Sequence, residues 1–400
     1  MSVLVKIWRW SWVVTLPISL IFGIWFWQTA NRYLTFGVRY DAAPFTVSLH
    51  RTGAVEFVHL LRNLKLAATA NAFSKDDSEG LRNINLFVTE SNLNRLDGNL
   101  PYSGFEYVDG LIYNEGTFQK IEYRYRGDFI YHWGRHKRSI RVKTKKKNLF
   151  EGIRTFNLIA PKSDHMFSNY FGYKLAEKFG LITPISELVN VNLNGENQGV
   201  HVLVEQLDEL TLRRSRRMPG DLYGGELLGK DAVEGARGDI FESPGLWKKI
   251  AVNNHYAEES FSPLNRLTSL VNSEPTDLVQ AKLWDLLDLD MWGKFAAFET
   301  IGQTFHYDNI HNWRLYFDPI TSKFIPVIWD PMVWNGPWMP REGALARFDV
   351  LPSKLHNMLM YNSDFLEARH SAISAFFESG MDLELVDDIE QAMALMEGDI

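Results

Sequence analysis

The first regular feature of the chain is an apolar segment near its N-terminus. Residues 10–27 read WSWVVTLPISLIFGIWFW and carry no charged side chain. A helix rising about 1.5 Å per residue would extend this segment over roughly 27 Å, close to the ~30 Å hydrocarbon core of a bilayer. Tryptophans gather at both ends, where aromatic rings are stable at membrane interfaces. The pattern predicts an uncleaved transmembrane helix.

A cleaved signal peptide is the alternative for this segment. Its apolar region would be about 7–15 residues long, and a small-residue cleavage site would follow it. Here the polar sequence WQTANRY follows. Lys6 and Arg9 precede the segment, and Arg32 and Arg39 follow it, which gives a slight preference for a cytoplasmic N-terminus. We therefore expect a single-pass membrane protein that contacts the membrane through one helix and whose soluble body lies outside the cytoplasm.

Beyond this segment the hydrophobic pattern changes between strand and helix periods. It predicts a helix around 55–72 and strands at 45–50, 83–90, 121–126 and 139–143. The next helix is predicted over 164–180, with Asp164 as its cap and Gly180 at its end. Residues 186–206 predict a hairpin that turns at Asn194-Gly195, a pair that readily takes positive φ angles.

The second half of the chain is less uniform. Residues 211–275 show little periodicity and contain several Gly and Pro residues, so we interpret them as loops or an insertion. A long helix is then predicted over 277–305, followed by two strands and a final amphipathic helix, at 312–317, 323–329 and 381–400. This mixture predicts the α+β class.

Composition and missing motifs exclude several kinds of function. Forty-two Lys and Arg against 49 Asp and Glu give a net charge of −7, so no general basic coat is present and no nucleic acid is expected as a partner. The chain has no Cys, which excludes disulfides, thiolate nucleophiles and cysteine metal sites. H-E-x-x-H, G-x-S-x-G and Walker motifs are absent, and the histidines are interpreted as ordinary surface or core residues.

The most informative polar residues lie between the long helix and the last hairpin. In the segment 306–330 the two strands return the chain from Asp308 and Asn312 toward Asp330. Carboxylates and an amide brought together would suit Mg²⁺ or Mn²⁺ beside phosphates. A kinase uses one carboxylate to position the acceptor hydroxyl, and an Asn and a second Asp to hold metal ions. The alternative is that these residues only form turns.

A basic run at 135–147, RHKRSIRVKTKKK, contains eight Lys or Arg residues. On a strand, Arg141 and Lys143 would share one face. If that face lines a cleft, Lys143 would bind phosphate as a point charge. The alternatives are an edge strand that its lysines protect from aggregation and a polyanion-binding surface, to which the run RRSRR at 213–217 would contribute.

Several ordered blocks carry a family resemblance. They are NLIAPKSD, LAEKFGL, LNGENQGVHVLVEQLDE and the NWRLYF…IWD ending, within residues 120–335. Together they resemble the CotH kinase family, atypical protein-kinase-like proteins named after a bacterial spore-coat protein. The resemblance implies a kinase-like two-lobed fold behind the transmembrane helix, with ATP and a divalent metal between the lobes. The implied domains are an anchor (1–34), a mixed α/β extension (35–118), an N-lobe (119–210) and a C-lobe with an insertion near 211–275 (211–400).

The resemblance also implies roles for individual residues. Asp308 would be the catalytic aspartate, and Asn312 and Asp330 would hold Mg²⁺ or Mn²⁺. Lys143 would contact the phosphates of ATP, and Glu205 would lie near the adenine and the segment that joins the lobes.

The chain departs from the kinase pattern at several points. Asp308 and Asn312 are four residues apart, where protein kinases have five. Many family members have a second acid after Trp-Asp, where this chain has Met332, and no G-x-G-x-x-G loop is present. By order along the chain, Glu177 would be the partner of Lys143. Two hypotheses follow: a membrane-anchored kinase that transfers the γ-phosphoryl group of ATP to a protein Ser or Thr, and an inactive kinase-like module that binds a cell-envelope or surface component.

Overall fold

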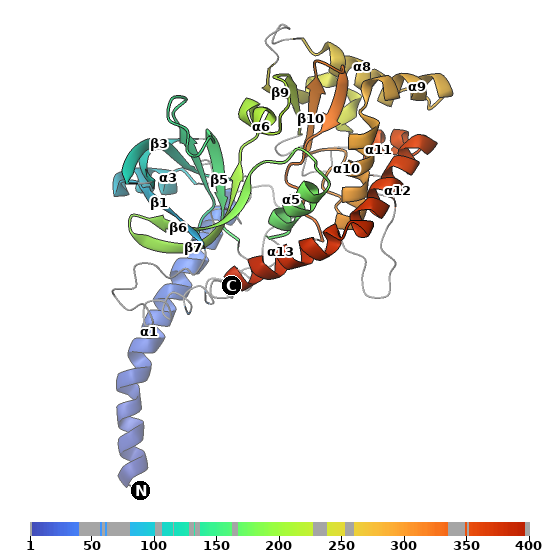
Figure 1. Ribbon diagram of the computed structural model, residues 1–400. Coiled ribbons are helices and arrows are strands. Elements are labelled where there is room, and N and C mark those ends of the chain that lie inside the picture. The colour runs from blue at the N-terminus through green and yellow to red at the C-terminus, as the bar shows by residue number, and fades with distance from the viewer. Residues whose placement is uncertain are drawn as a thin grey trace.

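A β-barrel and a helix-rich part with its own small sheet make up the body of the protein (Figure 1). The computed structural model describes residues 2–39, 57, 61, 81–100, 106–114, 116–127, 132, 137–161, 167–226, 238–252, 260–334, 349 and 352–396. Helices and strands both contribute to the core, so the predicted α+β class is confirmed.

Seven strands close the barrel in the order β1-β2-β3-β4-β5-β7-β6. Their bounds are β1 (Arg82–Phe87), β2 (Val108–Asn114), β3 (Thr117–Tyr125), β4 (Ile140–Thr144), β5 (Thr155–Ile159), β6 (Ser186–Leu193) and β7 (Glu196–Glu205). Neighbours are antiparallel except β1 and β6. Alternate side chains, such as Leu86, Ile112 and Val142, fill the interior. The barrel combines β1 and β2, from the expected extension (35–118), with strands from the expected N-lobe (119–210).

Local sequence signals specify much of the barrel. The strands predicted at 83–90, 121–126 and 139–143 are confirmed as β1, β3 and β4. The hairpin between β6 and β7 turns at Asn194 and Gly195, whose φ angles are 54° and 86°. Both angles are positive, as a two-residue type I′ turn requires. The strand predicted at 45–50 and most of the helix predicted at 55–72 lie outside the described residues.

The second sheet has the order β11-β10-β8-β9. Its strands are β8 (Asp221–Gly225), β9 (Trp247–Ala251), β10 (Trp313–Asp318) and β11 (Lys323–Pro326). The interpretation of 211–275 as a region that contains loops or an insertion missed two core strands, β8 and β9. The sequence analysis does not predict β8, because its residues DLYGG are buried at every position and show no alternation of apolar and polar side chains. Its glycines are needed there, since a Cβ on Gly225 would lie 2.7 Å from the ring of Trp247.

The further α-helices of the described residues lie in the helix-rich part, except α3, which contacts β2 of the barrel. They are α3 (Glu90–Gly98), α5 (Ser168–Lys178), α6 (Glu209–Arg214), α8 (Ser262–Val271), α9 (Asp277–Leu286), α10 (Leu289–Gly302), α11 (Lys354–Leu359), α12 (Ser363–Glu378) and α13 (Met381–Met396), with short 3₁₀ turns at Ile240–Glu242 and Pro244–Leu246. The helix predicted over 277–305 is two helices. The chain breaks at Leu287, which bridges to Phe324, and Asp288 caps α10 by accepting from the Met291 N–H at 3.1 Å.

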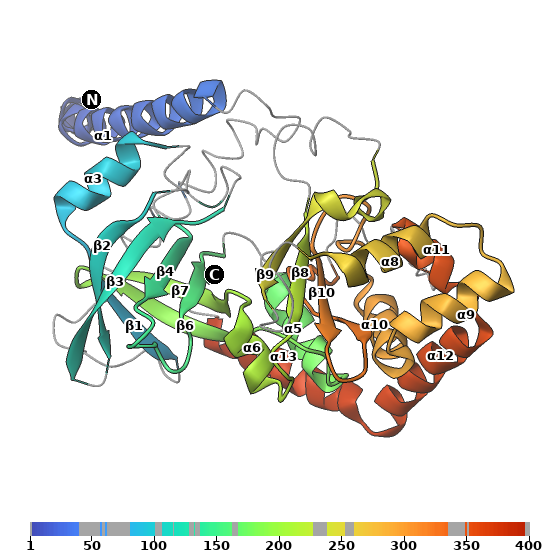
Figure 2. The same cartoon turned by 90° about the horizontal axis from the view of Figure 1, so that it is seen from above.

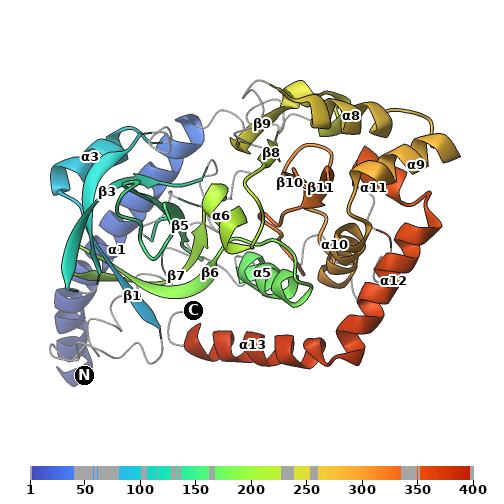
Figure 3. The ribbon, with the colours of Figure 1, turned by 45° about the horizontal axis from the view of Figure 1, so that its top comes forward.

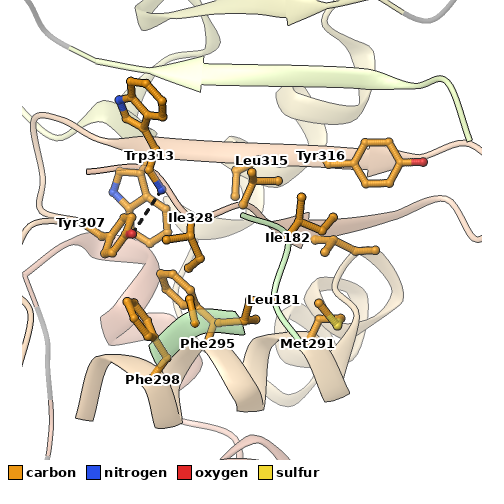
Figure 4. Close-up of a cluster of buried hydrophobic side chains, with 14 of the residues drawn as sticks. Leu181, Ile182, Met291, Phe295, Phe298, Tyr307, Trp313, Leu315, Tyr316 and Ile328 are labelled. Atoms are coloured by element: carbon orange, nitrogen blue, oxygen red, sulfur yellow. Dashed lines mark hydrogen bonds between the residues drawn. The ribbon is translucent and has the colours of Figure 1, made fainter. Parts of the chain in front are cut away.

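The core of the helix-rich part lies between α10 and the β10-β11 hairpin. Phe295 and Phe298 of α10 pack against Tyr307 and Trp313 (Figure 4). The buried Tyr307 hydroxyl accepts a hydrogen bond from the Trp329 N–H at 3.3 Å. In Figures 2 and 3, α5 lies between the barrel and α10, and it contacts both β6 and α10. This helix therefore connects the barrel to the segment that follows β11.

The N-terminal segment is helical, as predicted, within α1 (Ser2–Arg39). Within the described part of the chain, however, no helix combines the length and the apolar character needed to cross a membrane. The predicted transmembrane anchor over 10–27 is therefore not supported. The extracytoplasmic location of the body stays a prediction.

Candidate active site

Asp308 lies in the turn that joins α10 to β10. Its Oδ1 accepts hydrogen bonds from the Ile310 N–H at 2.8 Å and the His311 N–H at 3.0 Å. The His311 ring also donates from Nδ1 to this oxygen at 2.8 Å. Asp308 therefore shapes a turn, as the alternative interpretation expected, and it also fixes a histidine at the surface of the site.

Asp330 follows β11 and is held by α5. Asn169 donates from Nδ2 to Asp330 Oδ1, and the main-chain N–H of Asp330 donates to the Tyr173 hydroxyl at 3.1 Å. Gly172, the residue before Tyr173, packs directly against Pro331, where an added Cβ would lie 2.5 Å from the proline ring. The helix thus fixes both the backbone and the carboxylate of Asp330.

Two histidines connect the acids. The rings of His306 and His311 lie edge to face with centroids 4.8 Å apart. His306 Nδ1 donates to the main-chain oxygen of Asp330 at 2.6 Å and lies 3.8 Å from its Oδ2. Asn312 donates from Nδ2 to the main-chain oxygen of His306 at 3.1 Å. Asp308, Asn312 and Asp330 therefore converge around this histidine pair, and we call the five residues the 308–330 cluster.

Backbone strain is concentrated in this cluster and the residues that follow it. Asn312, Asp330 and Met332 have φ angles of 69°, 50° and 42°. Left-handed backbone costs a non-glycine residue free energy, and such residues gather at functional sites, where packing holds them in place. Here Asn169 supplies part of that support, because its Oδ1 accepts from the Met332 N–H at 2.7 Å.

The Asp308–His311 pair is electrostatically coupled. Burial alone would raise the pKa of Asp308, but the hydrogen bond and charge of His311 outweigh burial and lower that pKa. Burial would lower the pKa of His311, yet the hydrogen bond and charge of Asp308 raise it. The ion pair is therefore present over a pH range that begins below the usual carboxyl pKa and ends above the usual histidine pKa.

This pairing gives a pH prediction. An NMR titration of His311 will report a pKa above 6.5, and Asp308→Asn will lower that pKa because the anionic partner is lost. The stabilisation from His311 is complete below 6.5 and disappears as the pH rises through the folded-state pKa. An unchanged His311 pKa in Asp308→Asn would show that the two side chains are not coupled.

Asp330 is also kept ionised. Burial would raise its pKa, but the charges of His306 and Arg126, with the hydrogen bond from Asn169, lower it. Arg126 directly follows β3, so a cation of the barrel acts on an acid of the helix-rich part.

The remaining predicted residues lie elsewhere. Lys143 on β4 pairs with Glu122 at 2.5 Å and lies 5.3 Å from the ring centre of Tyr107. Within the described part of the chain, the structure shows no contact between Lys143 and the 308–330 cluster. Glu177, its expected partner, pairs instead with Lys174 of the same helix at 3.0 Å.

Glu205 is buried at the end of β7, where the chain passes from the barrel to α6. Its carboxylate accepts from the Ile185 N–H and the Thr211 hydroxyl, each at 3.0 Å, and pairs with Arg214. Burial raises its pKa more than these partners lower it. Its hydrogen bonds tie the residue before β6 and the start of α6 to the end of β7, and the role of Glu205 beside the adenine stays a prediction.

Sequence reasoning missed four participants: His306, His311, Asn169 and Arg126. The two histidines carry no metal-ligand spacing, so only their position on either side of Asp308 could have drawn attention to them. Asn169 and Arg126 reach the site through tertiary contacts with α5 and the barrel, which no local pattern reveals.

The donor types present fit a metal bound together with a nucleotide. Mg²⁺ is usually held by one or two carboxylates plus phosphate oxygens, and Asp330 and Asn312 offer a carboxylate and an amide. Among the described residues no group of three or more His, Asp or Glu is arranged to hold a metal by itself. A metal here would thus depend on the phosphates for part of its ligands.

Comparison with known families then identifies the chain. A sequence profile described as CotH kinase protein matches residues 123–368. The chain belongs to the CotH kinase family. This confirms the resemblance carried by the blocks between NLIAPKSD and the Trp-Asp ending.

Individual relatives are more distant. The inner spore coat protein H of Bacillus subtilis (strain 168) is 24% identical over 213 residues, which make up 52% of this chain and 57% of that protein. The chain thus matches little more than half the length of this CotH relative. A solved structure, the Shewanella oneidensis MR-1 toxin–antitoxin complex of HipA, HipB and operator DNA, aligns at a TM-score of 0.25 with 13% identity, covering 74% of this chain and 65% of that chain.

Proposed function

We propose that this CotH-family protein is an ATP-dependent phosphotransferase whose active centre is the 308–330 cluster. Its substrate would be a Ser or Thr hydroxyl of a protein. The proposal is carried by one observation, the convergence of Asp308, Asn312 and Asp330 around His306 and His311. Phosphoryl transfer in kinases uses one carboxylate to orient the acceptor hydroxyl, and an Asn and a second Asp to hold metal ions. Catalysis is mostly this orientation together with charge neutralisation.

Each residue has a role in this scheme. Asp308, held ionised by His311, would orient the acceptor hydroxyl and take up its proton. Asp330 and Asn312 would hold Mg²⁺ or Mn²⁺, and a bound metal would neutralise charge on the phosphates. Asn169 and Tyr173 keep Asp330 in place, and Arg126 adds positive charge from the barrel side. The barrel would then be the N-lobe of a two-lobed kinase, with the nucleotide beside it.

Transfer of radiolabel tests this proposal. The full chain is incubated with γ-³²P-labelled ATP, Mg²⁺ or Mn²⁺, and a protein acceptor rich in Ser and Thr. We expect metal-dependent labelling that Asp308→Asn abolishes and that Asp277→Asn, an exposed acid at the start of α9, leaves intact. Labelling that is absent with both metals, or equal in the Asp308 variant, would overturn the assignment.

An inactive binding module is the second candidate function. The observation in its favour is Met332, which occupies the position where many family members have a second acid. Its main-chain N–H bonds to Asn169, so this position supports the loop but offers no carboxylate. Under this alternative the cluster would bind neither ATP nor metal.

A further inference from the structure

A cavity of about 760 Å³ lies on the barrel, outside the 308–330 cluster. It extends from the end of β1 and the start of α3, across β2 and β3, to the end of β4. Five basic side chains line it, namely Lys120, Lys143, Lys145, Lys146 and Arg154, against two acids, Asp109 and Glu122.

The fold removes the ordinary explanation for these lysines. A lysine-rich strand often protects the open edge of a sheet against aggregation. β4, however, is paired on one side with β3 and on the other with β5, inside a closed barrel. The sequence-based alternative of a protected edge strand is therefore wrong, and the positive charge along 143–146 calls for another role.

Most of this charge is available to a ligand. Glu122 neutralises Lys143, but Lys120, Lys145 and Lys146 have no ion pair among the described residues. In addition, the buried Arg154 Nε has no hydrogen-bond partner in the part of the chain that the structure describes. A buried donor without a partner is costly, so this side chain has hydrogen-bonding capacity that the described residues leave unused.

Apolar surface continues from the same place. A second cavity of about 590 Å³ shares Lys120 and Lys145 with the first and includes Phe118. The Phe118 side chain is 60% exposed, and its ring centre lies 5.4 Å from that of Phe87 and 5.0 Å from that of Tyr113. The two cavities and these rings make one basic and aromatic surface, which we call the barrel groove.

We propose that the barrel groove binds an acidic segment of a partner protein. Clustered ammonium groups attract carboxylates or phosphates, and the exposed rings give apolar side chains of such a segment a place to pack. A nucleic acid fits less well, because Asp109 and Glu122 would repel a continuous phosphate backbone and the chain carries a net charge of −7. This proposal is independent of phosphotransfer.

Fluorescence anisotropy of a labelled peptide tests the proposal. The probe is a twelve-residue peptide of mostly Glu with two Leu, added to the full chain without ATP or metal. The double variant Lys145→Glu/Lys146→Glu should weaken binding about tenfold or more, as expected when paired charges become repulsive. The matched control, Lys248→Glu/Lys282→Glu, makes the same charge change at exposed sites of the helix-rich part and should bind as the natural chain does.

Phe118→Ser provides a second variant, since the exposed ring contributes little to folding. We expect it to weaken peptide binding while leaving the binding of inorganic polyphosphate unchanged. Three results would overturn the proposal: no peptide binding by the natural chain, equal losses in the two lysine variants, or full peptide binding in Phe118→Ser. Tighter binding of single-stranded DNA than of the peptide would also contradict it. None of these results bears on phosphotransfer, which is measured separately.

Discussion

Replacing Asp330 by Asn should lower phosphoryl transfer on the order of 10³-fold or more, because the site loses the carboxylate that would hold the charge-neutralising metal. The substitution keeps the shape of the side chain and removes its negative charge. In the structure burial would raise the pKa of Asp330, but the charges of His306 and Arg126 and the hydrogen bond from Asn169 lower it. The initial rate of label transfer, measured over a range of Mg²⁺ concentrations, reports the effect.

Asp318→Asn is the matched control for this experiment. Asp318 ends β10 and, like Asp308, accepts from a main-chain N–H two residues ahead, at 2.9 Å from Ile320. It lies in the sheet β11-β10-β8-β9, whose hairpin connects Asn312 to Asp330, but it is outside the 308–330 cluster. We expect this variant to keep its activity. Equal activity in Asp330→Asn and the natural chain would remove Asp330 from the catalytic machinery.

Replacing Glu299 by Ala should lower the free energy of unfolding by about 3–5 kcal/mol, because it leaves a polar partner buried and unsatisfied. Glu299 and His356 are 3% and 2% exposed and lie 2.9 Å apart, from Oε1 to Nε2. On its other side the His356 ring bonds to the Ser353 hydroxyl, which caps α11. Urea unfolding followed by circular dichroism measures the loss.

Two further variants make that measurement specific. Glu299→Gln keeps an acceptor beside His356 and should cost about 1 kcal/mol, the usual net value of one hydrogen bond. Glu378→Ala, on the exposed surface of α12, should cost little. A loss in Glu299→Ala no larger than that in Glu378→Ala would show that the buried pair does not stabilise the fold.

This buried pair also supports the candidate site. The ring centre of His356 lies 5.1 Å from that of Trp313, and the indole N–H of Trp313 donates to the main-chain oxygen of Asp308 at 2.7 Å. The turn that carries the proposed catalytic residue is therefore hydrogen-bonded to a buried indole ring, which in turn packs against the buried Glu299–His356 pair. Such support is needed because positioning errors of about 1 Å are costly in catalysis.

The sequence predicts those parts of the fold whose signals are local. The Asn194-Gly195 turn, the alternation in β3 and β4, and the hairpin that returns the chain to Asp330 all depend on neighbouring residues. Closure of the barrel cannot be predicted in this way, because it depends on the parallel pairing of β1 with β6, about a hundred residues away. β8 is missed for the related reason that a strand buried on both faces has no alternation.

The residues of the candidate site differ in the same way: some can be predicted from local sequence and others cannot. Asp308, Asn312 and Asp330 could be selected because one hairpin brings them together, and the structure places them in one cluster. Asn169, from α5, and Arg126, from the barrel, enter only through packing between distant segments. As the cation that the barrel contributes, the sequence analysis selected Lys143. The alternation of its strand shows which face Lys143 lies on, but it does not show that Glu122 pairs with it.

Thermal melting with ATP and Mg²⁺ tests the central claim most directly, because a ligand bound only by the folded state must stabilise that state. At about 100 times its dissociation constant, such a ligand adds about 2.7 kcal/mol. If Asp308, Asn312 and Asp330 form a nucleotide and metal site, the melting temperature rises only when ATP and Mg²⁺ are both present, and Asp330→Asn removes the rise. No rise in the natural chain, or the same rise in Asp330→Asn, would contradict the account.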